Sequence, residues 1–294
     1  MRSLVSEPTL HLGTSAFSAD QRVIMAIVNR TPDSFYDAGR TFSDDRAMSA
    51  VDAAVAAGAE IVDIGGVKAG PGVEVDLDTE LSRTVDFVAA VRERHPEVII
   101  SVDTWRHEVG EAVCRAGADL LNDAWGGHDP ELAHVAAQFG VGLVCTHAGG
   151  AAPRTRPHRV QYEDVVASVT DFLDQEAARA EAAGVDHRRI LVDPGHDFGK
   201  NTRHSLAVTR ELGRLTALGR PLLVSLSNKD FVGETLDAPV GERLVGTLAA
   251  TAISSWLGAQ VFRVHEVHET RAVLAMVQAI AGAEGPAVAR RGLA

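Results

Sequence analysis

Short apolar runs alternate with longer amphipathic segments along the whole chain. The apolar runs are rich in Val, Ile and Leu and are bounded by turn residues, which is typical of buried strands. We predict eight strands, at Val23–Val28, Glu60–Ile64, Val98–Val102, Leu120–Asn122, Gly142–Thr146, Ile190–Val192, Pro221–Ser225 and Val261–Val264. Helical periodicity is found between them, as at Asp44–Ala57, Leu81–Arg94, Glu108–Ala116, Tyr162–Ala183, Ser205–Leu218, Glu242–Leu257 and Val267–Ile280.

This alternation predicts an α/β protein, a single-domain (β/α)₈ TIM barrel. Its 294 residues are an ordinary length for such a barrel. Glycines stand where the helices should end, at Gly58, Gly117, Gly140, Gly184, Gly219 and Gly258. The alternative is an open doubly wound sheet, but the Gly-rich dinucleotide turn that normally follows its first strand is missing after Val28. We predict a barrel over residues 22–283, a poorly ordered N-terminal extension at 1–21 and a C-terminal tail at 284–294.

Polar groups lie at the carboxyl end of every predicted strand. The stretches concerned begin at Asn29, Asp63, Ser101, Asn122, Thr146, Asp193, Ser225 and Arg263. Because the carboxyl ends of barrel strands share one rim, where barrel enzymes build their sites, we expect these groups to lie together.

Composition excludes several classes of partner. The formal charge of −12 and the lack of a basic cluster argue against nucleic acid or an anionic membrane, although a few local groups can still bind a small anion. Two cysteines, Cys114 and Cys145, argue against a disulfide framework or a cysteine zinc site. The histidines His265 and His268 are three residues apart, not the four of the helical zinc signature. With neither a membrane-spanning run nor a signal peptide, we expect a soluble cytoplasmic protein.

Motifs in order along most of the chain define a family resemblance. They read IMAIVNRTPDSFYDAGRTF, DIGGVKAGPG, SVDTW, AGADLLNDAWGG, ILVDPGHDFGK, SLSNKDFVG and FRVHEVHET. From about Val23 to about Met276 the sequence resembles the dihydropteroate synthase family, pterin-binding TIM barrels. The resemblance implies condensation of a dihydropterin pyrophosphate with 4-aminobenzoate, releasing pyrophosphate with the help of Mg²⁺.

The resemblance also implies roles for individual residues. Catalytic roles fall to Asp103, Asp193 and Lys229, and pterin binding to Asp103, Asn122, Asp193, Phe198 and Lys229. The pyrophosphate would be held by Asn29, Arg263 and His265, with Asn29 also the expected Mg²⁺ contact. These types suit a pterin edge, which presents alternating donors and acceptors. A strand-end Asp is also a common helix cap, so Asp63 is interpreted as structural, and Phe198 could equally belong to the core.

Departures from the family gather at the pocket for 4-aminobenzoate. This pocket would comprise Phe35, Ala69, Gly70, Pro71, Asn228 and Asp230. The family commonly has Thr and Arg where Ala69 and Gly70 stand, and Arg and Ser in place of Asn228 and Asp230. Asp230 would put an anion at the helix start that normally receives the aminobenzoate carboxylate. Thr146 replaces a common methionine, and His196-Asp197 replace an apolar residue and a glycine.

These departures resemble the divergent second paralogues, whose synthase activity is impaired or absent. Four interpretations stay open: a weak or inactive synthase that binds pterins, an active synthase, a transferase whose nucleophile lacks a carboxylate, and a non-catalytic binding or regulatory protein. The helix at Leu244–Leu257 is apolar nearly all round, which suits either the core or a homodimer interface. The chain has only three lysines, Lys68, Lys200 and Lys229, and all follow predicted strands.

Overall fold

The predicted barrel is confirmed. A computed structural model describes residues 8–31, 43–68, 70, 72–150, 152–155 and 161–291. Eight parallel strands form one sheet, and a bridge between Val192 and Leu222 joins its two edges. In barrel order, closing back on the first, the strands are β3 (Val23–Asn29), β4 (Ile61–Gly65), β5 (Ile99–Asp103), β6 (Leu120–Asp123), β7 (Gly142–Thr146), β8 (Ile190–Asp193), β9 (Leu223–Val224) and β10 (Val261–Val264).

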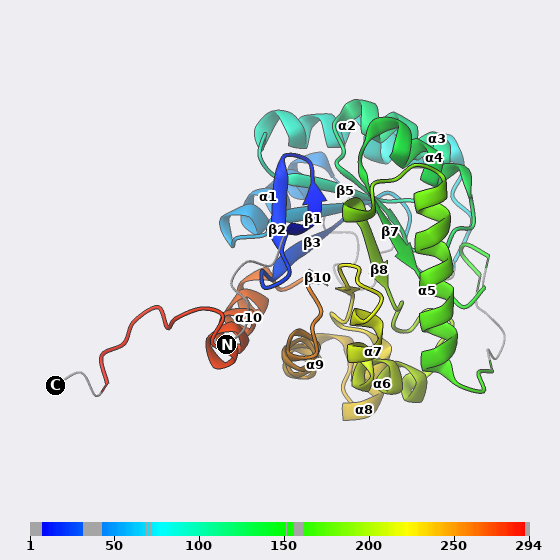
Figure 1. Ribbon diagram of the computed structural model, residues 1–294. Helices are drawn as coiled ribbons and strands as arrows, with labels where there is room; N and C mark the ends of the chain where they lie inside the picture. Colours follow the sequence, from blue (N-terminus) through cyan, green and yellow to red (C-terminus); the bar gives the residue numbers. More distant parts are fainter. Residues whose placement is uncertain are drawn as a thin grey trace.

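Helices surround the sheet (Figure 1). They are α1 (Asp44–Ala56), α2 (Leu77–Arg94), α3 (His107–Ala116), α4 (Glu131–Phe139), α5 (Val165–Ala182), α6 (Thr202–Arg210), α7 (Leu212–Thr216), α8 (Asp230–Leu236), α9 (Leu244–Trp256) and α10 (Val267–Ala281). The helix predicted at 205–218 is two helices because the backbone leaves the helical conformation at Glu211. All six predicted helix-ending glycines have positive φ, as at Gly117, where φ is 111°. No helix in the described ranges is long and apolar enough to cross a membrane.

The prediction of a poorly ordered N-terminus is wrong for residues 8–18. An antiparallel hairpin, β1 (Pro8–Leu12) and β2 (Ser15–Ser18), occupies this stretch. Leu10, Leu12 and Phe17 are buried in one cluster with the inward-facing residues of the barrel, so the hairpin covers the amino-terminal end of the strands. The alternation of Leu10 and Leu12 before a Gly13 turn was the sequence signal for this hairpin.

The barrel interior changes from apolar to polar along its axis. Its apolar layer consists of Val23, Met25, Ile61, Ile99, Leu120, Val144, Leu191, Leu223 and Val261. Side chains alternate along a strand, so positions two or four residues further on also point inward. These positions hold Asn29, Asp63, Ser101, Asp103, Asn122, Thr146, Asp193, Ser225 and Arg263. A polar layer therefore lies above the apolar one, at the carboxyl ends of the strands.

Candidate active site

A buried ion-pair network forms the floor of the barrel mouth. Arg263 donates through Nε to Asp63 at 2.6 Å and through Nη2 to Asp103 at 2.9 Å. Asp63 also accepts hydrogen bonds from the Ser101 hydroxyl at 2.6 Å and from the Asn122 amide at 3.2 Å. Asp63 therefore contacts Arg263, Ser101 and Asn122, and its interpretation as a structural residue stays a prediction. Because one guanidinium faces two carboxylates, the floor keeps carboxylate oxygens that can accept hydrogen bonds from a ligand.

Burial governs the protonation of the floor carboxylates. It raises the pKa of Asp103, while the neighbouring Arg263 opposes that rise. Burial also raises the pKa of Asp193, whose Oδ1 accepts the Gly195 N–H at 2.7 Å. Lys229 lies near enough to Asp193 to favour its ionised form. Groups of this kind can accept N–H donors from the edge of a flat heterocycle.

An aromatic wall stands beside the floor. The Lys229 ammonium lies 4.4 Å from the centre of the Phe198 ring, so two predicted pterin residues are in contact. Phe198 packs edge-on against Trp125, with ring centres 5.8 Å apart, and Trp125 packs in the same way against Trp105 at 6.2 Å. Sequence reasoning missed both tryptophans as site residues. Their position directly after β5 and β6 was the available signal.

Lys200 connects the loops after β7 and β8, and the loop after β8 carries Phe198. Its buried ammonium contacts the backbone carbonyl oxygens of His147, Gly195 and Phe198 at 3.0–3.1 Å. It also donates to His147 Nδ1 at 2.7 Å. Burial and the adjacent Lys200 lower the pKa of His147 to about 3, so its ring is a neutral acceptor near pH 7. Lys200 therefore fixes Phe198 through the backbone, a role the scarcity of lysine did not reveal.

The three residues predicted to bind an anion lie on adjacent strands. Asn29 ends β3, while Arg263 lies on β10, which pairs with β3, and His265 directly follows it. His265 Nδ1 lies 2.9 Å from the Ser227 hydroxyl, which also lies 2.9 Å from a carboxylate oxygen of Glu266. Arg263 is already paired with the floor carboxylates, which the sequence did not indicate. Anion binding itself stays a prediction.

Arg154, from the segment after β7, donates hydrogen bonds to backbone carbonyls of the loop after β4. Phe35, Ala69 and Pro71 lie outside the described residues. The carbonyls of Lys68 and Gly70 accept from Arg154 Nη1 at 2.6 and 2.8 Å, and the Val73 carbonyl accepts from Arg154 Nε at 3.1 Å. Sequence reasoning missed Arg154, which comes from the segment after β7. These bonds connect the loop after β4 to the segment after β7.

Two carboxylates lie at the start of α8. Asp230 is its first residue, as predicted, but its side chain is 80% exposed and pairs with Arg243 Nη1 at 2.9 Å, and its effect on a co-substrate stays a prediction. Asp197 Oδ2 also accepts the N–H of Phe231, the second residue of α8, at 3.3 Å. The side chain of Asn228 is buried and donates to Glu266 at 2.8 Å. Side chains of the protein itself therefore take up hydrogen-bonding groups at the start of α8.

Comparisons with known proteins agree with this geometry. The family model described as pterin binding enzyme matches residues 25–265. The protein named inactive dihydropteroate synthase 2 of Mycobacterium tuberculosis is 56% identical over 281 residues, covering 94% of this chain and 88% of that protein. The dihydropteroate synthase of Escherichia coli K12 is 37% identical over 262 residues, covering 89% of this chain and 92% of that enzyme.

A solved structure shows the same fold over nearly the whole chain. It is the Yersinia pestis dihydropteroate synthase in complex with a sulfonamide drug, at a TM-score of 0.88 and 34% identity, covering 94% of this chain and 99% of that one. Fold and site together define a pterin-binding barrel. The chain belongs to the dihydropteroate synthase family.

Proposed function

We propose that the protein binds a dihydropterin, or its pyrophosphate, in the mouth of the barrel. The observation that carries this proposal is the meeting of Asp103, Asn122 and Asp193 at the inward ends of three strands, with Lys229 above Phe198. The carboxylates and the amide take the donors of the ring edge, Lys229 donates to its acceptors, and Phe198 packs on its face. Membership of the family supports the choice of a pterin over other flat heterocycles.

Calorimetry with a pterin pyrophosphate tests this proposal. Asp193→Ala removes a charged acceptor and is expected to cost about 1.5–3 kcal/mol of binding free energy. Asp171→Ala, an exposed carboxylate of α5, is the matched control and should bind as the unmodified protein does. Equal affinity of the two variants, or no pterin binding by the unmodified protein, would refute the assignment.

The pyrophosphate and Mg²⁺ belong to the same proposal. Asn29, Arg263 and His265 would hold the pyrophosphate, and the Asn29 amide oxygen would be a Mg²⁺ ligand. An amide oxygen suits this hard cation, which usually takes its remaining ligands from water and substrate phosphates. The bound cation would stabilise the negative charge of the leaving pyrophosphate. Asn29→Ala should weaken pyrophosphate binding, and the loss should be larger when Mg²⁺ is present than when it is absent.

We further propose that condensation with 4-aminobenzoate is weak or absent. Asp197 already accepts a backbone N–H at the start of α8, and the arginine common in the loop after β4 is Gly70. A substrate carboxylate would meet a carboxylate there and would lack its cation. If these effects total about 4 kcal/mol, condensation slows roughly a thousandfold. The similarity to a protein named inactive dihydropteroate synthase 2 also supports weak or absent condensation.

An assay for dihydropteroate, together with rescue of a folate auxotroph, tests this second proposal. The unmodified protein should form little product and should fail to rescue. Combining Asp197→Gly with Ala69→Thr, Gly70→Arg, Asn228→Arg and Asp230→Ser should restore measurable turnover or 4-aminobenzoate binding. Ordinary enzymatic rates from the unmodified protein would contradict the proposal.

A transferase acting on another nucleophile is the second candidate function. The carboxylates of Asp197 and Asp230 favour a neutral or cationic nucleophile over an anionic one. Pyrophosphate release measured against neutral, cationic and carboxylate-bearing amines separates the possibilities. Release with a neutral or cationic amine supports a transferase, whereas pterin binding without release from any amine supports a binding or regulatory role.

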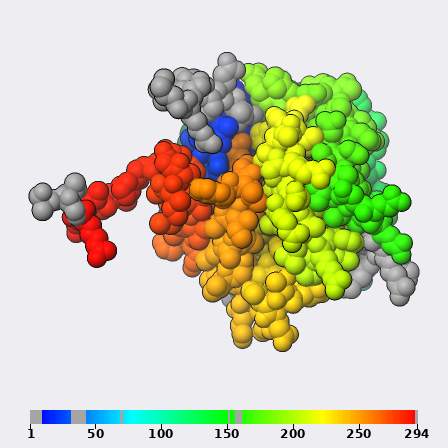
Figure 2. Space-filling view, turned by 60° about the horizontal axis from the view of Figure 1, so that its bottom comes forward, coloured from blue at the N-terminus to red at the C-terminus, as the bar shows by residue number. Residues whose placement is uncertain are grey.

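The quaternary proposal is a cytoplasmic homodimer formed through α9. The buried side of this helix carries Thr247, Thr251, Ser254 and Ser255, while Val245, Ile253 and Trp256 are 54–78% exposed. A surface helix usually has its apolar side buried and its polar side exposed. Because α9 has the reverse arrangement, its exposed apolar face favours burial against a second copy of the chain. In Figure 2 the orange segment that includes α9 lies on the outside of the molecule. Trp256→Glu should convert a dimer into monomers in sedimentation velocity, and a monomeric unmodified protein would contradict the proposal.

A further inference from the structure

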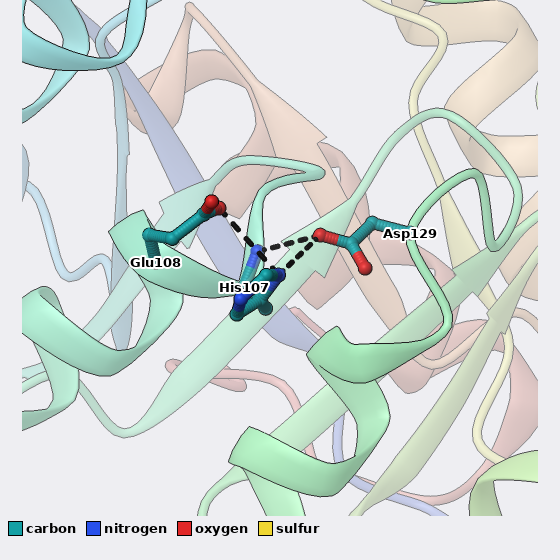
Figure 3. Close-up of side chains that lie close together, drawn as sticks. All are labelled: His107, Glu108 and Asp129. Atoms are coloured by element: carbon teal, nitrogen blue, oxygen red, sulfur yellow. Dashed lines mark hydrogen bonds and ion pairs between the residues drawn. The ribbon is translucent and has the colours of Figure 1, made fainter.

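A histidine and two carboxylates gather outside the barrel mouth floor. His107 and Glu108 are the first two residues of α3, and Asp129 precedes α4 (Figure 3). His107 Nδ1 lies 2.8 Å from Asp129 Oδ2 and 3.5 Å from Glu108 Oε2. One ligand atom from each residue lies within 4.8 Å of the others. The Asp129 carboxylate also accepts the backbone N–H groups of His107 and Glu131, which hold it in place.

Other histidine–carboxylate contacts in the molecule have a different charge environment. Asp52 contacts His95 at 2.8 Å, but Arg94 also binds it with both of its oxygens at 2.7 Å. Asp186 contacts His187 at 3.5 Å and is bound by Arg188 at 2.7 Å. Within the described part of the chain, the ion pairs of Glu108 and Asp129 are with His107 alone. With a neutral imidazole this cluster carries two negative charges, which a divalent cation would neutralise.

A surface pocket of about 360 Å³ opens beside the cluster. Glu108, Asp129 and the exposed His128 line it, and Trp105 forms part of its wall. The guanidinium of Arg106, which also lines the pocket, is directed to Glu80 and to the Val75 carbonyl. The pocket leaves room for further ligands on the open side of an ion, including water, a small anion or the His128 ring.

We propose that His107, Glu108 and Asp129 form a binding site for a divalent transition-metal ion of the Zn²⁺ class. One imidazole nitrogen and two carboxylate oxygens are ligands that Zn²⁺ accepts, at about 2.0–2.2 Å each. The ion replaces the hydrogen between His107 Nδ1 and Asp129, and the exposed Glu108 side chain rotates to complete the set. Its open coordination positions face the pocket, where water or a small anion binds. Oxygen-only cations such as Mg²⁺ are disfavoured by the imidazole.

Zn²⁺ titration of chelator-treated protein, without pterin, tests the site independently of the proposed function. Calorimetry should show one saturable equivalent. Its affinity should fall at least tenfold in His107→Gln and in Asp129→Asn, and by less in Glu108→Gln. His95→Gln is the matched control, because His95 also contacts an aspartate but shares it with an arginine. It should bind Zn²⁺ as the unmodified protein does.

Location of the ion completes the test. Crystals soaked in Zn²⁺ should show anomalous scattering at the zinc edge within about 2.2 Å of His107 Nδ1 and an Asp129 oxygen. Thermal unfolding of each variant shows whether the fold is kept. The proposal is overturned by absence of saturable binding, by equal affinity of His107→Gln and His95→Gln, or by an ion located only at other histidines.

Discussion

The floor of the barrel mouth and its co-substrate side are built in different ways. Floor residues such as Asp63, Asp103 and Arg263 are inward positions of strands, and the guanidinium of Arg263 binds both carboxylates. The co-substrate side consists of loops, where Asp197 and Arg154 occupy backbone groups that a ligand could otherwise approach. Strand positions are constrained by the barrel core, whereas loop residues can change without disturbing it. This difference supports the proposal that the chain binds a pterin while its pocket for 4-aminobenzoate has diverged.

The largest expected effect comes from breaking the floor network. Arg263→Met would leave Asp63 and Asp103 buried without their common counter-ion. Removing one partner of a buried pair typically costs about 3–5 kcal/mol, so urea unfolding should show a loss of stability of this size. Arg188→Met, which breaks an exposed pair with Asp186, should leave the unfolding midpoint unchanged. Similar midpoints for both variants would mean that the floor is not held by its charges.

An intermediate effect is expected where the floor meets the loops. Lys200→Met removes the donor shared by the carbonyls of His147, Gly195 and Phe198. Leaving buried acceptors unpaired should cost about 2–3 kcal/mol in unfolding free energy. Pterin affinity should also fall, because Phe198 loses its fixed backbone, although Lys200 lies under the loops and not on the ring. If the folded Lys200→Met protein binds the pterin as tightly as the unmodified protein does, the position of Phe198 does not depend on Lys200.

Sequence reasoning predicted the strand-borne half of the site better than the loop-borne half. Alternation within β4, β5, β8 and β10 already indicates which polar residues share the barrel interior, and the eight strands agree with the predictions to within two residues at each end. Loop contacts depend on segments distant in sequence. Asp230 is paired by Arg243, thirteen residues later, and Asp197 reaches Phe231, thirty-four residues later. No local pattern indicates such pairs, so the sequence showed neither the partner of Asp230 nor the second carboxylate, Asp197, at the start of α8.

The smallest expected effect concerns Thr146, which belongs to the floor by position but not by bonding. It ends β7 at an inward position, opposite Asp193 in the register, and is only 2% exposed. Among the residues that the structure describes, its hydroxyl oxygen has no hydrogen-bond partner, whereas the Thr84 hydroxyl donates to the Glu80 carbonyl at 2.8 Å. A buried hydroxyl without a partner is a cost to the folded state that a bound ligand can remove.

Thr146→Val should therefore have opposite effects on folding and on binding. Replacing an unpaired hydroxyl by a methyl of similar shape should raise the unfolding free energy of the ligand-free protein by up to about 1 kcal/mol. Pterin affinity should fall, because the ligand loses the hydroxyl as a partner. Thr84→Val is the control, since removing a bonded hydroxyl should destabilise the protein without changing pterin affinity. If Thr146→Val stabilises the protein and leaves affinity unchanged, the hydroxyl faces no polar group of the ligand, and the pterin floor ends at β6 and β8 without a contribution from β7.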